Sequence, residues 1–219
     1  MNQPILFATP LSHFARKVRI LLAELDVPFE LRFVPNLLSS DPADFGGNPI
    51  LRIPTLLHGE RWIIESDQIV RYIVETWDPG DRLGCLALDP EQRNVLSILS
   101  ALMAAEVELI LSARSGIEGV DAMPYFQRHH AVIEHCLVWL EEHGRHQWLG
   151  TDDADESGAK QRRKRAFSYL DVTLVAAWEH LQHKQLGPNL ERFPWLAERV
   201  ALFAERPSVA PSAPRLTGL

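Results

Sequence analysis

The sequence predicts two structural parts, a small mixed α/β domain followed by an all-helical domain. In the first part, short apolar runs alternate with helical patterns, but only as far as residue 78. The run Asp78-Pro79-Gly80-Asp81 then breaks the pattern, and no convincing strand pattern follows it. Residues 91–115 show instead a long apolar periodicity that is typical of a helix. We therefore expect an α/β domain over residues 1–78, a linker over 79–90 and a helical domain over 91–219.

The elements expected in the first part follow the order β-α-β and then β-β-α. Residues 5–8 are apolar and typical of a strand. The next apolar residues recur at the spacing of one helix face: Val18, Leu21, Leu22 and Leu25. Later, a short polar break that contains Gly59 separates two apolar bursts and indicates a hairpin. The further expected elements are a helix over 14–25, strands over 28–34, 54–57 and 62–64, a short helix within 39–47 and a helix over 66–77.

The second part is expected to hold helices alone. Pro124 suits the first turn of a helix. Ser168 and Asp171 have the spacing of a capping box, in which two side chains close the start of a helix. The expected helices are 91–115, 124–143, 172–181 and 194–206, followed by a tail with Pro211 and Pro214 that lies over the surface.

Composition argues against several classes of function. The 219 residues carry a formal net charge of −7, which disfavours nucleic acid or anionic lipid as the main partner. No apolar run approaches the roughly 20 residues that span a bilayer, and the N-terminus shows no signal-sequence pattern. Cys85 and Cys136 match neither a zinc nor a redox spacing. We expect a cytoplasmic protein that binds neither membrane nor nucleic acid.

One charged segment, residues 151–165, changes sign midway. The acidic residues come first and the basic residues follow: Asp152, Asp153, Asp155 and Glu156, then Lys160, Arg162, Arg163, Lys164 and Arg165. A nucleic-acid patch or a localisation signal is one interpretation, but a solvated loop whose halves partly neutralise each other is the favoured one.

The stretch between the first strand and the first helix is the leading candidate for chemistry. Ser12 stands just ahead of the first helical turn, where backbone N–H groups lack partners and the helix dipole is positive. A hydroxyl held there can help to bind an anion. The alternative is that Ser12 only caps the helix, as serine commonly does.

Three motifs of the chain occur in a characteristic order. The first is S-H-F-A-R-K-V, which starts at Ser12. The second is N-P-I-L-R-I-P-T-L from Asn48, followed by E-S-D-Q-I from Glu65. The third is S-Y-L-D from Ser168. In this order and at these spacings, the sequence resembles the cytosolic glutathione S-transferases over nearly its whole length, and in particular bacterial members of the serine type.

The resemblance implies a thioredoxin-like N-terminal domain, an all-helical C-terminal domain and glutathione as co-substrate. It also implies a cis bond before Pro54, so that the backbone of Ile53 pairs strand-fashion with the cysteinyl part of glutathione. A trans proline at the start of an edge strand is the alternative. Glu65 would accept from the γ-glutamyl ammonium, and Ser66 would either bind the γ-glutamyl carboxylate or merely cap its helix. The implied glutathione-binding residues are Ser12, Phe14, Arg52, Ile53, Pro54, Glu65 and Ser66, with Arg52 equally a candidate for the glycyl carboxylate or for a surface role.

In the same resemblance, Ser12 is the catalytic residue and points at the glutathione sulfur, with Thr9 as a competing hydroxyl. A free thiol has a pKa of about 8.5, and a hydroxyl donor together with the helix dipole favours its thiolate. The thiolate would attack an electrophilic carbon, and no metal is required. His13 replaces the family's usual proline. A solvent-facing His13 is favoured over an imidazolium beside the sulfur.

A second, hydrophobic and electrophilic substrate is expected between the two domains. One helix stripe would form a wall of its pocket, although such a stripe is more often core. The implied pocket residues are Leu11, His13, Leu102, Met103 and Glu106. Family members form a two-fold dimer, so a homodimer is expected. The histidine pairs His129-His130 and His143/His146 lack partners at ligand spacing, which argues against a metal site.

The first hypothesis is therefore a serine-type, detoxifying glutathione S-transferase. The second is a non-catalytic glutathione-fold protein with a binding or regulatory role. A complete glutathione pocket favours the enzyme, whereas the altered S-H-F loop favours the non-catalytic protein. A glutathione-dependent reductase, dehalogenase or isomerase is a third hypothesis, because a fold alone does not separate these activities.

Overall fold

The computed structural model describes residues 2–119, 122–149 and 166–214 of the 219-residue chain. Contacts divide the chain into two compact units, Met1–Leu86 together with the stretch from Arg206, and Ala87–Glu205. The charged segment 151–165 lies outside the described residues.

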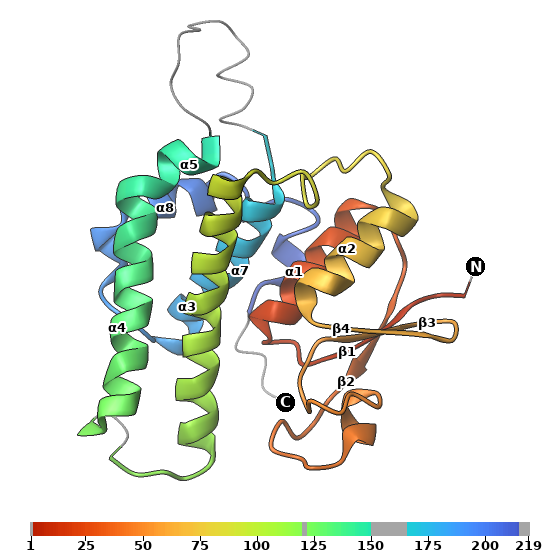
Figure 1. Ribbon diagram of the computed structural model, residues 1–219, viewed down its shortest axis with the longest axis horizontal. Helices are drawn as coiled ribbons and strands as arrows, with labels where there is room; N and C mark the ends of the chain where they lie inside the picture. The colour runs from red at the N-terminus through yellow and green to blue at the C-terminus, as the bar shows by residue number, and fades with distance from the viewer. Residues whose placement is uncertain (1, 120–121, 150–165, 215–219) are drawn as a thin grey trace, which may run out of the picture. The chain divides into compact units, whose positions relative to one another are not determined.

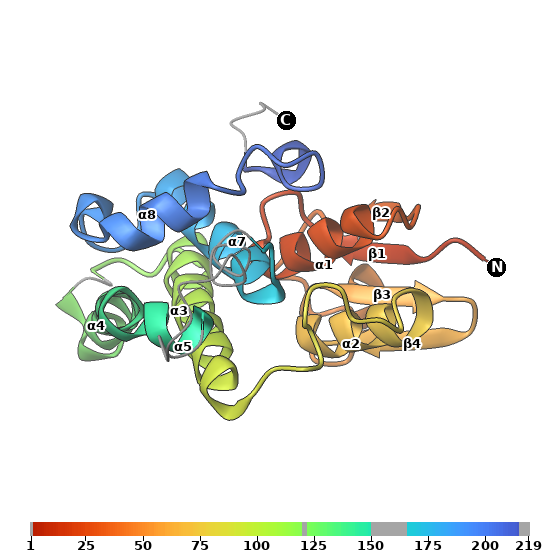
Figure 2. The same cartoon turned by 90° about the horizontal axis from the view of Figure 1, so that it is seen from above.

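The N-terminal unit is built on a four-stranded sheet with the strand order β2-β1-β3-β4 (Figure 1). Strand β1 (Ile5–Ala8) is parallel to β2 (Glu30–Phe33) and antiparallel to β3 (Thr55–His58), which is antiparallel to β4 (Arg61–Ile64). Two helices, α1 (His13–Glu24) and α2 (Ser66–Trp77), lie side by side on one face of this sheet (Figures 1 and 2). Helix α1 makes the crossover that a parallel pair such as β1–β2 requires.

Both faces of the sheet are covered by apolar side chains. On one face, Leu6 of β1 and Leu56 of β3 are opposite each other in the register and fully buried. Side chains alternate along a strand, so Phe7 points to the other face. There it packs with Val34 and with Phe45 of the 3₁₀ helix η1 (Pro42–Phe45). Burial of each such large side chain contributes about 1.5–3 kcal/mol.

Every element predicted for this unit is present, in the predicted order. Helix α2 has the predicted limits, while α1, β2, β3 and β4 differ from theirs by one or two residues at an end. The hairpin β3–β4 turns at Gly59, whose φ of 63° is the left-handed conformation that glycine adopts readily.

The C-terminal stretch packs against α1, whereas the sequence predicted a tail over the surface. At the end of α1, Glu24 accepts hydrogen bonds from Nε and Nη2 of Arg206, both at 3.0 Å. Further along, Nε of the buried Arg16 donates to the buried Ser212 at 3.1 Å. Ser212 ends the short 3₁₀ helix η5 (Ala210–Ser212). These contacts make the stretch a part of the N-terminal unit.

The second unit is helical in all its regular elements among the described residues. In chain order they are α3 (Pro90–Arg114), α4 (Pro124–Trp139), a π-helical turn η3 (Leu140–Gly144), α5 (Arg145–Leu149), α7 (Tyr169–Lys184), the 3₁₀ helix η4 (Leu190–Arg192) and α8 (Pro194–Ala201). The long helices α3 and α4 run side by side (Figure 1). Helix α7 is the core helix, because 12 of its 16 residues are buried.

The start of α7 is fixed by the predicted capping box. The hydroxyl of Ser168 accepts from the N–H of Asp171, and the carboxylate of Asp171 accepts from the N–H of Ser168 at 2.8 Å. The same carboxylate binds Arg199 of α8 through two hydrogen bonds, of 2.6 Å from Nε and 2.9 Å from Nη2. Both side chains are buried, so this ion pair holds α8 against α7.

Two helices end earlier than predicted. Helix α4 passes into the π-helical turn after Trp139, so the expected helix over 124–143 has two parts. Helix α8 ends at Ala201 and not at residue 206. After Ala201 the chain continues in turns up to residue 205, where the N–H of Ala204 still donates to the carbonyl of Val200 at 2.9 Å.

Helix α3 corrects the expectation that no segment is apolar enough to span a membrane. By length and composition alone, α3 is apolar enough to cross a membrane, because an 18-residue window within it has a mean hydropathy of 1.9, and it is the one helix among the described residues with this property. Its apolar residues pack against α4 and α7. A helix in the core of a protein is apolar on several sides for this reason.

Candidate active site

Three segments of the N-terminal unit meet at one end of the sheet. Phe7 of β1 lies opposite Thr55 of β3, and Thr55 lies opposite Ile64 of β4. Antiparallel neighbours place the end of one strand beside the start of the next. The segments that follow β1, precede β3 and follow β4 therefore emerge together. They are residues 9–12, 52–54 and 65–66, which contain most of the residues predicted to bind glutathione.

Ser12 is the N-cap of α1. Its Oγ accepts a hydrogen bond from the N–H of Ala15 at 3.2 Å, so Ser12 does cap the helix, whereas its role toward a ligand stays a prediction. Its own N–H donates to the carbonyl of Thr9 at 3.2 Å, which fixes the turn before the helix. A hydroxyl that accepts one bond can still donate its proton. The half-buried Ser12 hydroxyl therefore keeps a donor at the positive end of the helix dipole.

Asn48 fixes the loop that leads into β3. This residue is 1% exposed, and its Nδ2 donates to the carbonyl of Arg52 at 2.8 Å and to Oγ1 of Thr55 at 3.2 Å. Its Oδ1 accepts from the N–H of Ile50 at 3.1 Å. The sequence interpretation used Asn48 only as part of a motif and missed this role. The N-P pair at the start of the loop was the available signal.

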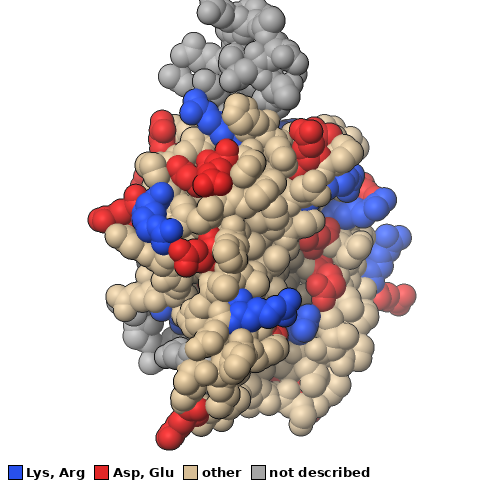
Figure 3. Space-filling model, turned by 60° about the vertical axis from the view of Figure 1, so that its left-hand side comes forward, with Lys and Arg blue, Asp and Glu red and all other residues tan. Residues whose placement is uncertain are grey.

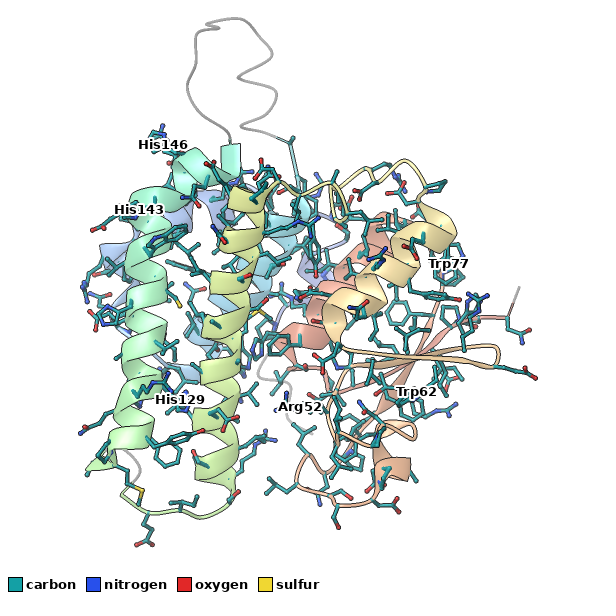
Figure 4. The ribbon with its side chains drawn as sticks, viewed as in Figure 1. Arg52, Trp62, Trp77, His129, His143 and His146 are labelled. Carbon is teal, nitrogen blue, oxygen red and sulfur yellow. The ribbon has the colours of Figure 1, made fainter. Side chains whose placement is uncertain are left out.

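The bond between Ile53 and Pro54 is cis, as the resemblance implied. Pro54 is buried, Ile53 is half-buried, and the side chain of Arg52 is exposed (Figure 4). The backbone of this segment is held by Asn48, while the Arg52 side chain extends into solvent. A role for Arg52 at the glycyl carboxylate stays a prediction.

Glu65 and Ser66 form the start of α2. Glu65 is the N-cap and has a φ of 64°, in the left-handed region that residues with a side chain seldom occupy. Its side chain makes no capping bond and is exposed. Ser66 is buried in the first turn, where backbone N–H groups lack partners within the helix. An exposed carboxylate beside a helix N-terminus suits a group that carries both an ammonium and a carboxylate.

A buried lysine reaches this helix start from α1. Nζ of Lys17 donates to Oδ1 of Asp67 at 2.8 Å, and it lies 5.6 Å from the ring centroid of Phe14. The Lys17 side chain is fully buried, whereas the Asp67 side chain is 47% exposed. Burial lowers the pKa of Lys17, and the carboxylates of Asp67 and Glu65 oppose that shift. The sequence interpretation gave neither Lys17 nor Asp67 a role.

His13 differs most from its expectation. It is 3% exposed, so the favoured interpretation of a solvent-facing histidine is wrong. Its ring centroid lies 4.8 Å from that of Phe14, which is half-buried. A histidine in place of proline at the start of α1 is therefore packed as part of the protein interior.

The predicted pocket residues of α3 are all buried. Leu102, Met103 and Glu106 are at most 1% exposed. Glu106 shares a hydrogen bond with Nδ1 of His180 in α7, and desolvation raises the pKa of Glu106 well above its ordinary value. The assignment of these residues and of Leu11 to a second-substrate pocket stays a prediction.

Two further histidines of the helical unit, His129 and His143, contact aromatic side chains. Figure 4 shows His129 on α4 and His143 in the turn after it. The ring of His129 lies 4.5 Å from that of Tyr125, edge to face. The ring of His143 stacks on Trp139 at 5.4 Å.

The surface charges are mixed in sign. On the face drawn in Figure 3, Lys and Arg side chains are interspersed with Asp and Glu among uncharged residues. Some charged side chains of the described residues are paired, as in the 2.7 Å contact between Arg192 and Glu134. Among the described residues of that face, no long basic stripe offers the charge that a phosphate backbone needs.

Comparisons with known proteins find similarity to glutathione S-transferases. Residues 11–76 match the family model "Glutathione S-transferase, N-terminal domain". Glutathione S-transferase 3 of Glycine max is 35% identical over 94 residues, which are 42% of each chain. Glutathione S-transferase U11 of Arabidopsis thaliana is 30% identical over 132 residues, which are 60% of this chain and 54% of that one. The matched part spans about half the length of these relatives, or less.

Solved structures match over nearly the whole chain. A glutathione S-transferase from Methylobacterium radiotolerans, in complex with glutathione sulfonate, has a TM-score of 0.76 at 24% identity and covers 100% of this chain and 98% of its own. A glutathione transferase family member from Pseudomonas fluorescens, with bound glutathione, has a TM-score of 0.75 at 19% identity and covers 98% of this chain and 100% of its own. At these identities the likeness shows the fold.

The fold is thus a thioredoxin-like N-terminal domain followed by a helical C-terminal domain, which is the architecture of glutathione transferases. Residues 11–76 match the N-terminal domain of glutathione S-transferases, and the solved glutathione transferases share the fold of the whole chain.

Proposed function

We propose that this protein is a serine-type glutathione transferase, which activates the thiol of glutathione for attack on a small, hydrophobic electrophile. The observation that carries the proposal is the strand register, which brings the segments of Ser12, Ile53 and Ser66 to one end of the sheet. The solved relatives that hold glutathione or its sulfonate support glutathione as the ligand. A cytoplasmic location and a homodimeric state belong to the same proposal.

Each part of glutathione has a partner at this end of the sheet. The backbone of Ile53 precedes β3 and pairs with the cysteinyl part as an added strand would. The exposed carboxylate of Glu65 accepts from the γ-glutamyl ammonium. Ser66 and the N–H groups of the first turn of α2 bind the γ-glutamyl carboxylate. Phe14 and Pro54 flank the peptide, and Arg52 is the candidate for its glycyl carboxylate.

Ser12 stabilises the thiolate of the bound glutathione. Its hydroxyl donates to the sulfur while its Oγ still accepts from Ala15, so the helix cap holds the donor in place. A hydrogen bond to a charged acceptor contributes about 1.5–3 kcal/mol. Each unit of pKa lowering needs about 1.4 kcal/mol. One such bond therefore lowers the thiol pKa by about one to two units, enough to make the thiolate abundant at neutral pH.

Calorimetry with glutathione and turnover of an activated aryl halide test the proposal. Ser12→Ala should keep its glutathione affinity and lose about tenfold to a hundredfold in turnover at saturating glutathione. Thr9→Val removes the neighbouring hydroxyl and is the matched control, with turnover expected to stay as in the wild type. Unchanged turnover of Ser12→Ala with every electrophile would remove Ser12 from the mechanism. A wild-type protein that binds no glutathione would overturn the proposed function itself.

A further inference from the structure

The Ser12 hydroxyl is held in place by the first turn of helix α1. Its Oγ accepts from the N–H of Ala15 at 3.2 Å, and its carbonyl accepts from the N–H of Arg16 at 2.8 Å. The other proposed contacts of glutathione, at Ile53 and Ser66, lie on separate segments of the chain. The distance between the Ser12 hydroxyl and the bound sulfur therefore depends on where the first turn of α1 lies in the N-terminal unit.

Arg16 joins that turn to the C-terminal stretch. The Arg16 side chain is buried, and its Nε donates to Oγ of Ser212 at 3.1 Å. The Ser212 hydroxyl in turn donates to the carbonyl of Val209 at 2.7 Å. A hydroxyl has one proton to donate, so the bond to Val209 leaves the lone pairs of Ser212 available to Arg16. The first turn of α1 is thus bonded to a residue 196 positions away from Arg16.

A second contact holds the other end of the helix. Glu24, the last residue of α1, accepts from Nε and Nη2 of Arg206 and from the hydroxyl of Ser208. At about 1.5 Å of rise per residue, Arg16 and Glu24 lie about 12 Å apart along the helix axis. The C-terminal stretch therefore holds α1 at two well-separated points.

Apolar packing alone would fix the helix less firmly. The buried face of α1 includes Val18, Leu21 and Leu22. The stabilisation from apolar burial depends on the area removed from water and has no preferred direction, whereas a hydrogen bond requires a particular distance and angle. Burial of a guanidinium is also costly compared with burial of an apolar side chain. The contact between Arg16 and Ser212 thus supplies a defined helix position, which apolar packing does not.

We propose that Ser212 is a positioning residue for Ser12. Through Arg16 it holds the first turn of α1 where the Ser12 hydroxyl reaches the sulfur of glutathione, and Ser208 supports the same arrangement at Glu24. The inference rests on the proposed function and adds to it a role for the C-terminal stretch in activating the thiol.

Ser212→Ala tests the inference through the thiol pKa of bound glutathione, which the ultraviolet absorbance of the thiolate measures. Without the acceptor at position 212, the first turn of α1 is held less firmly and the Ser12 donor is aimed less well. The thiol pKa should rise by about 0.5–1, and turnover of an activated aryl halide at neutral pH and saturating glutathione should fall about threefold to tenfold. Turnover should approach the wild-type rate at a pH above the raised pKa.

Two measurements separate positioning from a merely structural effect. Glutathione affinity in mild acid, where the bound thiol is protonated, should stay near that of the wild type. In a Ser12→Ala background the hydroxyl is absent, so Ser212→Ala should cause no further rise of the thiol pKa. Ser97→Ala is the matched control, because the Ser97 hydroxyl donates to the carbonyl of Arg93 at 2.8 Å within α3, and this variant should titrate as the wild type does.

An unchanged thiol pKa in Ser212→Ala would overturn the inference, even if that variant unfolds more readily than the wild type. A further rise in the Ser12→Ala background would overturn it too, because Ser212 would then act without Ser12. If Ser212→Ala does not fold, Ser208→Ala decides, since it loosens the same stretch at Glu24 and an unchanged thiol pKa there contradicts the inference. A wild-type protein that binds no glutathione overturns the proposed function as well, whereas a thiol pKa that responds to Ser12→Ala but not to Ser212→Ala overturns the inference alone.

Discussion

Replacement of Asn48 by alanine should destabilise the N-terminal unit and weaken glutathione binding. Asn48 is buried and makes three hydrogen bonds, to the carbonyl of Arg52, to Oγ1 of Thr55 and from the N–H of Ile50. Each hydrogen bond contributes about 0.5–1.5 kcal/mol net, and a buried partner left unpaired costs more. The expected loss in the free energy of unfolding is therefore about 2–4 kcal/mol.

Urea unfolding and glutathione calorimetry measure the two effects of Asn48→Ala. Asn36→Ala is the matched control, because the Asn36 side chain is exposed and accepts a single bond, from the N–H of Leu38 at 2.9 Å. That control should cost no more than about 0.5 kcal/mol. A loss for Asn48→Ala no larger than for the control would refute the view that Asn48 holds the loop before β3. If Asn48→Ala is destabilised but binds glutathione as the wild type does, the same view is refuted.

Two further predictions concern ion pairs elsewhere in the chain. Arg199→Met breaks the buried pair with Asp171 and should cost about 3–5 kcal/mol in unfolding free energy. Arg192→Met breaks an exposed pair with Glu134 and should cost less than about 1 kcal/mol. Similar losses for the two variants would contradict the view that the buried pair holds α8 against α7. Burial alone would raise the pKa of Glu24, but hydrogen bonds from Arg206 and Ser208 outweigh it and hold that pKa below its ordinary value. The stability that Glu24 contributes is thus complete above the unfolded-state pKa and is lost as pH falls through the folded-state pKa. The Tm difference between wild type and Glu24→Gln should shrink in acid, and a pH-independent difference would refute this reasoning.

Local signals were enough to predict the order of the elements. The helix periodicity after Ser12, the Gly59 turn and the capping box at Ser168 each depend on residues a few positions apart. For that reason the strands, α1 and α2 appear within two residues of their predicted limits, while α7 contains the predicted helix over 172–181 and extends it by three residues at each end. The candidate site was found through a family resemblance, and its grouping at one end of the sheet follows from the strand register.

The contacts missed by sequence analysis join distant parts of the chain. Lys17 and Asp67 are 50 positions apart, and Glu24 and Arg206 are 182 apart. The hydrophobic periodicity of a sequence predicts which face of a helix is buried. It does not predict which charged side chain on that face forms an ion pair with a distant residue. His13 was misassigned because the helix periodicity does not say whether a polar side chain at the start of α1 is buried.

The pKa of the glutathione thiol in the complex tests the central claim most directly, and thiolate absorbance in the ultraviolet measures it as a function of pH. We expect the thiol of glutathione bound to the wild type to titrate about one to two units below the value in water, and that of the Ser12→Ala complex to return most of the way to it. A bound thiol that titrates as it does in water, or one whose lowered pKa is unchanged in Ser12→Ala, would contradict the account.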